Sequence, residues 1–258
     1  MIQRVARSVG RTIAGAVATV AAPRMSRSLR TALRNVRFEL YMQRLHRASA
    51  KRAANLINGE PVRLNLGSGF HPKPGWINVD LVDDLSDLQL DLREPLPFPD
   101  NSVAQIYTEH FFEHLSFTSP ADSLAREIEA PDSPSDALTF LRECFRVLAP
   151  GGTIDIGVPD AEVALHDYLQ RQTAGGDGRG VNTNWWGPTW CDTPMHRLNY
   201  VFRQGHEHQY AWDYETLARV LAGVGFTSIS RRPFDPVLDH RNQTRSLFVR
   251  ATKWHEHN

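Results

Sequence analysis

Residues 62–69 read Val62-Arg63-Leu64-Asn65-Leu66-Gly67-Ser68-Gly69, a short apolar strand that runs directly into a glycine turn. A second apolar run follows and reaches Asp80 eleven residues after Gly69. Glycine tolerates a positive φ and has no Cβ, so Gly67 and Gly69 allow the backbone to approach a ligand closely. A carboxylate in the position of Asp80 can accept hydrogen bonds from a ribose. The stretch therefore predicts a nucleotide-type site at the end of a first strand.

The rest of the chain after residue 60 alternates between apolar strands and helical segments. Strands are expected at 62–66, 77–81, 88–92, 103–107, 153–158, 226–230 and 246–251, and helices at 136–148, 160–170 and 214–222. This order predicts a doubly wound α/β fold with a seven-strand, mostly parallel sheet. Ligands of such sheets bind outside the carboxyl ends of the strands, so a cofactor is expected at the turn after Leu66.

The formal net charge of zero hides two parts of opposite sign. Residues 1–58 contain twelve Arg or Lys and a single acid, Glu39, so residues 59–258 carry a compensating net charge of −11. Apolar residues recur at spacings of three and four in 1–58, which is typical of an amphipathic helix. Gly59-Glu60-Pro61 is a turn signal. The sequence thus predicts a basic helical arm at 1–58 and a catalytic domain at 59–258.

Several roles are open for the arm. It could bind an anionic membrane surface, act as an organelle transit peptide, or pack on its own acidic domain or on a second subunit. Nucleic-acid binding is least favoured, because the arm has only Phe38 and Tyr41 for base stacking. The longest uncharged run, 12–23, is too short to span a bilayer. The widely separated Cys144 and Cys191 indicate a reducing compartment, so we expect a cytoplasmic protein, with or without peripheral membrane attachment.

Five segments, taken together, resemble those of the class I S-adenosylmethionine-dependent methyltransferases. They are Leu64–Gly69, Gly75–Asp80, Asp91-Leu92, Glu109–Leu115 and Phe145–Gly152. The similarity is closest to small predicted methyltransferases associated with cell-envelope and saccharide biosynthesis, and it covers roughly residues 62–160 and 206–251. The third glycine of a dinucleotide fingerprint is missing, which argues against an NAD site. Ser68 and Phe70 depart from the more glycine-rich loop of the family.

The resemblance implies methyl transfer with S-adenosyl-L-methionine as the cofactor. It assigns a cofactor-binding set made of Asn65, Leu66, Gly67, Ser68, Gly69, Asp80, Leu81, Asp91, Leu92, Glu109 and His110. A hydroxyl acceptor also needs a base, and histidine suits that task near neutral pH. His208 is the first candidate, followed by His206 and His110. The alternative for His208 is a structural residue that caps or packs the following helix.

The acceptor side is expected around the irregular segment 174–205, which could act as a lid. Aromatic rings bind the C–H faces of sugars, which points to Trp185, Trp186, Trp190 and Tyr210 as substrate-binding residues. The alternative is that the tryptophans form a satellite core under a long loop. Asp160 is a further candidate acceptor contact, although a helix N-cap is the commoner role for Asp in such a position.

His110-Phe111-Phe112-Glu113-His114 spells the His-x-x-Glu-His of inverted zinc peptidases. That chemistry needs both histidines on one face of a helix, whereas here an apolar strand ends only three residues earlier. We therefore assign no metal ligands from sequence. The preferred function is O-methylation of a saccharide or of an envelope or natural-product intermediate. The rivals are a small-molecule or lipid methyltransferase, a cofactor-binding domain without turnover, and a zinc hydrolase.

Overall fold

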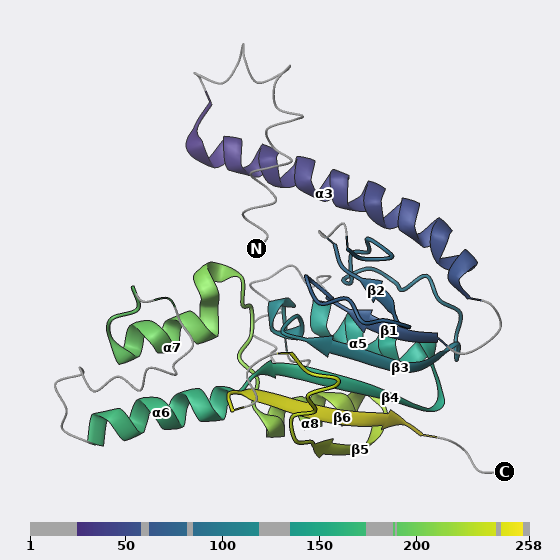
Figure 1. The fold of residues 1–258 in the computed structure, drawn as a ribbon. Helices are drawn as coiled ribbons and strands as arrows, with labels where there is room; N and C mark the ends of the chain where they lie inside the picture. Colours follow the sequence, from purple (N-terminus) through teal and green to yellow (C-terminus); the bar gives the residue numbers. More distant parts are fainter. Residues whose placement is uncertain are drawn as a thin grey trace.

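The computed structural model describes residues 25–57, 62–81, 85–118, 135–173, 188, 190–240 and 244–254, with only the backbone at 171–173. Its described part forms one open sheet of six strands in the order β2-β1-β3-β4-β6-β5 (Figure 1). The strands are β1 (Val62–Leu66), β2 (Ile77–Val79), β3 (Val103–Glu109), β4 (Leu148–Pro159), β5 (Phe226–Arg231) and β6 (Ser246–Lys253). The first four pair in parallel, and β6 is antiparallel to both β4 and β5. The predicted doubly wound α/β fold is confirmed.

The sheet has one strand fewer than predicted. The stretch expected as a third strand makes a single bridge, from Leu88 to Val79, and no further ladder. Toward β2, the N–H of Leu88 donates to the Asn78 carbonyl and the Leu88 carbonyl accepts from Asp80. On the opposite edge, the N–H of Gln89 donates to Ser49 Oγ at 3.0 Å, and the N–H of Asp91 donates to His46 Nδ1 at 3.2 Å. The stretch is therefore held between β2 and side chains of the arm without forming a regular strand.

Helices cover the sheet and build its core. They are α5 (Asp136–Val147), α6 (Ala161–Thr173), α7 (Pro194–Arg203) and α8 (Tyr214–Val224). Helix α5 packs on α8 and on the start of β5, where the rings of Phe145 and Phe226 lie 5.0 Å apart in an edge-to-face pair. Helices α6 and α7 pack on each other and extend beyond the sheet (Figure 1). β4 is buried from Ile154 to its end at Pro159, as expected for a central strand covered on both faces.

The arm contains the long helix α3 (Arg27–Ala53), which runs across the β2 side of the sheet (Figure 1). Its second half is docked, with Met42, Ser49 and Ala53 buried. Its first half presents an exposed apolar stripe formed by Leu29, Leu33, Val36 and Leu40. The predicted helix at 1–22 lies outside the described residues. Among the described helices, none is long and apolar enough to cross a membrane.

Candidate functional site

A cavity of about 390 Å³ lies at the carboxyl ends of β1, β2 and β3. This is the edge at which an open α/β sheet binds ligands, and the volume is within the usual range of small-molecule sites. The walls come from three sources: the turns after the strands, the arm, and two segments late in the chain. The lining residues used below are Phe38, Ser68, His71, Asp80, Leu81, Asp91, Leu92, Arg93, Glu109, His110, His114, Glu207, Gln209 and His240.

The glycine turn after β1 is fixed by backbone hydrogen bonds. The N–H groups of Gly67 and Ser68 both donate to the carbonyl of Val79, and Gly69 N–H donates to Asp80 Oδ2 at 2.9 Å. Gly67 has a φ of 71°, and a Cβ on it would lie 2.5 Å from Phe111 Cβ. Glycine is therefore required at 67 by contact with the turn after β3. The hydroxyl of Ser68 is buried and has no hydrogen-bond partner among the described residues, so it is available to a polar ligand in the cavity.

One end of the cavity combines a carboxylate with apolar walls. Asp80 stands there beside Leu81, Leu92 and the ring of Phe38, which comes from α3. From the sequence, the only role predicted for Phe38 is base stacking on nucleic acid. The docking of α3, which sequence spacing does not show, makes it part of this wall.

Asp91 anchors that wall. Its two carboxylate oxygens accept hydrogen bonds from Arg93 Nε at 3.0 Å and Arg93 Nη2 at 2.7 Å. Burial raises the pKa of Asp91, but the hydrogen bonds from Arg93 outweigh that effect and hold the pKa below its usual value. Arg93 also donates to Glu39 on α3 at 2.9 Å. The carboxylate of Asp91 therefore serves to join the loop and the arm at the rim of the cavity.

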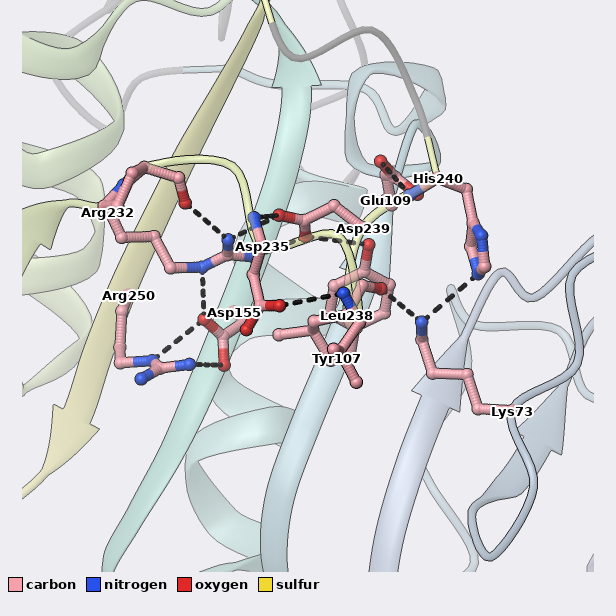
Figure 2. Close-up of polar contacts among 12 residues, drawn as sticks. Lys73, Tyr107, Glu109, Asp155, Arg232, Asp235, Leu238, Asp239, His240 and Arg250 are labelled. Atoms are coloured by element: carbon pink, nitrogen blue, oxygen red, sulfur yellow. Dashed lines mark hydrogen bonds and ion pairs between the residues drawn. The ribbon is translucent and has the colours of Figure 1, made fainter.

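A buried network holds the opposite wall in place (Figure 2). Asp239 accepts two hydrogen bonds of 2.7 Å from Arg232 and one of 3.1 Å from the Tyr107 hydroxyl. Arg232 also donates to the buried carboxylate of Asp155 on β4 at 2.7 Å. These contacts clamp the segment 232–240 against β3 and β4.

The clamp places His240 at the cavity. Its backbone N–H donates to the carboxylate of Glu109, and its ring stacks on His71 with centroids 4.7 Å apart. Lys73 Nζ donates to the Leu238 carbonyl and lies 4.1 Å from the centre of the Tyr107 ring. Burial lowers the pKa of Lys73 despite the nearby carboxylates. No local pattern in the sequence indicates a role for His71, Lys73 or His240.

His110 and His114 line the remaining side of the cavity and together form the histidine wall. His110 has a left-handed backbone with a φ of 52°, and its Nε2 lies 2.9 Å from Ser246 Oγ. His114 follows in the 3₁₀ turn η3 (Phe112–His114), with its Nδ1 2.8 Å from the Glu207 carbonyl. His208 lies behind this wall, in a small space shared with Glu113 and Tyr210. Its Nδ1 lies 2.6 Å from the Val201 carbonyl, and burial lowers the pKa of its ring.

The predicted cofactor-binding set converges on the cavity with one exception. Leu66 is fully buried in the core and does not line it. Asn65 lines it, and its amide donates to the His71 carbonyl and to Asn78 Oδ1, which secures the turn.

The predicted acceptor residues are scattered. His206 is exposed and does not line the cavity, and Trp190 is exposed and contacts His196 and Tyr200. Tyr210 packs on Phe117 and Trp212. Asp160 Oδ1 accepts from the N–H groups of Glu162 and Val163, which is the helix-capping alternative. Within the segment predicted to be irregular, Pro194–Arg203 form helix α7, whereas 174–187, with Trp185 and Trp186, and residue 189 lie outside the described residues.

No family model and no curated protein matches this sequence. Solved structures with a related arrangement include a SAM-dependent methyltransferase of Thermotoga maritima, at 14% identity and a TM-score of 0.41, which covers 86% of this chain and 96% of its own. Another from Archaeoglobus fulgidus has 16% identity and a TM-score of 0.42, covering 83% and 94%. A Haemonchus contortus phosphoethanolamine N-methyltransferase 2, in complex with S-adenosyl-L-methionine, has 12% identity and a TM-score of 0.42, covering 80% and 52%.

Proposed function

We propose that the chain is an S-adenosylmethionine-dependent methyltransferase that methylates a hydroxyl group on a saccharide or on an envelope or natural-product intermediate. One observation carries this proposal. A carboxylate, Asp80, and an unpartnered buried hydroxyl, Ser68, share one cavity at the carboxyl ends of β1 and β2. The five sequence segments that resemble the methyltransferase family support the same conclusion.

The residues present fit the cofactor. Asp80 can accept hydrogen bonds from a ribose diol, while Leu81, Leu92 and Phe38 offer apolar surface to an adenine ring. Ser68 Oγ can donate a hydrogen bond to a carboxylate such as that of a methionine moiety. Glu109 and His110 lie at the end of β3, beside the same cavity.

When bound, S-adenosylmethionine supplies an electrophilic methyl group on a sulfonium. The chain's own contribution is position, since holding two reactants aligned can provide roughly 7 to 11 kcal/mol of the barrier reduction. The turn at Gly67–Gly69 is rigid because three of its N–H groups are hydrogen-bonded to Val79 and Asp80. His110 and His114 line the same cavity. We propose that they orient the hydroxyl, and that the buried His208, whose ring lies 4.9 Å from that of His114, holds His114 in position.

The acceptor class is tested by transfer of a labelled methyl group. S-adenosylmethionine carrying the label is incubated with the full chain and with either a pool of saccharide intermediates or a lipid extract. Label in the saccharide pool is the expected result, and His208→Ala should lose most of it while retaining cofactor affinity. Label only in lipid would favour a lipid methyltransferase, and binding without transfer to either pool would favour a domain without turnover.

We also propose that the arm binds an anionic membrane surface. The exposed stripe of Leu29, Leu33, Val36 and Leu40 shares the first half of α3 with four arginines: Arg27, Arg30, Arg34 and Arg37. Each basic residue near such a surface contributes about 1 kcal/mol. Sedimentation with vesicles that contain anionic lipid should be lost in Leu33→Glu/Leu40→Glu and weakened by salt. Equal sedimentation with neutral vesicles would refute the proposal.

A further inference from the structure

His114 of the histidine wall and two side chains behind it, Glu113 and His208, bring their possible ligand atoms together. Glu113 and His114 are neighbours in η3, and His208 arrives from the segment after α7. One nitrogen of each histidine and one carboxylate oxygen all lie within 4.8 Å of one another. The two segments are joined because the N–H of Gln209 donates to the Glu113 carbonyl at 2.8 Å. The cluster is therefore held by backbone contacts as well as by its side chains.

Glu113 is the unexplained member of this cluster. The residue is 2% exposed, and among the described residues neither of its carboxylate oxygens accepts a hydrogen bond of regular geometry. Its nearest polar neighbours are His110 Nδ1 at 3.3 Å and His208 Nε2 at 3.9 Å. Burying a carboxylate costs several kcal/mol unless hydrogen bonds or a cation compensate it, and the contacts from His110 and His208 are long. A positive charge close to Glu113 would therefore stabilise its buried carboxylate.

The two histidines are oriented as metal ligands are. His114 Nδ1 faces the Glu207 carbonyl and His208 Nδ1 faces the Val201 carbonyl. A carbonyl can only accept, so each Nδ1 carries the proton and each Nε2 keeps its lone pair. A ring N–H that donates to a backbone carbonyl is the usual way in which a protein fixes a metal-binding histidine.

We propose that Glu113, His114 and His208 bind one divalent transition-metal ion of the Zn²⁺ type. Two imidazoles and one carboxylate are a common ligand set for zinc sites that keep an open position. The proposed ligand set differs from that of the inverted zinc peptidases, in which both histidines of His-x-x-Glu-His bind the metal. Here η3 is a single turn, and the second histidine ligand is His208. His110 lies next to the cluster and outside the proposed ligand set.

The proposed ion lies beside the cavity, because His114 is both a ligand and a lining residue. An ion there could bind an oxygen of the acceptor. This consequence, unlike the metal site itself, rests on the proposed methyltransferase function.

Metal binding is measured on the untagged, full-length protein after treatment with a chelator. Co²⁺ is titrated and its visible absorption recorded, and Zn²⁺ is then added as a competitor. We expect about one Co²⁺ per chain, displaced by one Zn²⁺. Glu113→Gln and His208→Ala should each weaken Co²⁺ binding at least tenfold, while the exposed His166→Ala should leave it unchanged. His110→Ala should also retain the Co²⁺ spectrum.

The variants are first compared by circular dichroism, and Glu113→Gln serves where His208→Ala does not fold. The proposal is overturned if the wild type takes up no stoichiometric metal, or if Glu113→Gln binds as tightly as the wild type. It is also overturned if His110→Ala abolishes binding while Glu113→Gln does not. Neither S-adenosylmethionine nor an acceptor is present, so a negative result would leave the methyltransferase proposal standing.

Discussion

The two sides of the cavity are built in different ways. On the proposed cofactor side, consecutive residues at strand ends form the wall, and backbone hydrogen bonds such as those from Gly67 and Ser68 to Val79 hold it. On the proposed acceptor side, histidines from distant segments meet through side chains, as His114 and His208 do around Glu113. A wall made from a local turn is visible in a sequence. A wall made by tertiary contact requires the structure.

The largest effect is expected where the segment 232–240 is clamped against β3 and β4. Asp155 is fully buried and accepts hydrogen bonds from Arg232 and Arg250. Asp155→Asn leaves Arg232 with only part of its compensating charge, so unfolding should cost about 3 kcal/mol less. Denaturant unfolding measures this, with the exposed Asp100→Asn as the control, expected to change stability by about 0.5 kcal/mol or less. Equal stabilities of the two variants would show that the clamp is not structural.

A smaller loss is expected at the glycine turn itself. Gly67→Ala introduces a Cβ 2.5 Å from Phe111 at a positive φ, which should cost about 2 to 3 kcal/mol of stability. In contrast, Gly223 in α8 has open space around its Cα, so Gly223→Ala should be neutral or slightly stabilising. Thermal unfolding compares the two. A Gly67→Ala protein as stable as the wild type would mean that the turn is less constrained than its contacts indicate.

Two aromatic residues, Phe38 and Trp190, are predicted to differ in their effect on S-adenosylmethionine affinity. Phe38 lines the cavity, so Phe38→Ala should weaken S-adenosylmethionine binding about five- to tenfold, or roughly 1 kcal/mol. Leu33→Ala on the same helix is the matched control, because Leu33 is exposed and does not line the cavity. Trp190→Ala should leave cofactor affinity unchanged. If Trp190→Ala weakens S-adenosylmethionine binding and Phe38→Ala does not, the proposed placement of the cofactor beside Phe38 is wrong.

The sequence predicted the parts of this molecule that depend on neighbours along the chain. The strand at 62–66, the glycine turn and Asp80 follow from local pattern, and the structure brings them to one cavity. The strand at 88–92 was predicted wrongly because a local apolar pattern shows burial but not the tertiary partners of the backbone, which pairs with β2 in a single bridge at Leu88. Phe38 and His240 were missed for the same reason, since each reaches the cavity through a tertiary contact.

The limit of prediction from the sequence is clearest on the proposed acceptor side. Chemical type made His206, His208 and Trp190 attractive, but only His208 lies close to the histidine wall, and it lies behind it. Nothing in the sequence indicates that Glu113 is buried, with His110 and His208 as its nearest polar neighbours. That property depends on the segment 207–210 folding over η3, as the hydrogen bond from Gln209 to the Glu113 carbonyl shows.

The most direct test of the account is calorimetric titration of S-adenosylmethionine into the full-length protein, the Asp80→Ala variant and the Asp192→Ala variant. Asp192 is an exposed carboxylate that does not line the cavity. We predict one binding site per wild-type chain, at least tenfold weaker binding after Asp80→Ala, which corresponds to about 1.4 kcal/mol, and no change after Asp192→Ala. Absence of binding to the wild type, or equal affinity of the wild type and Asp80→Ala, would contradict the account.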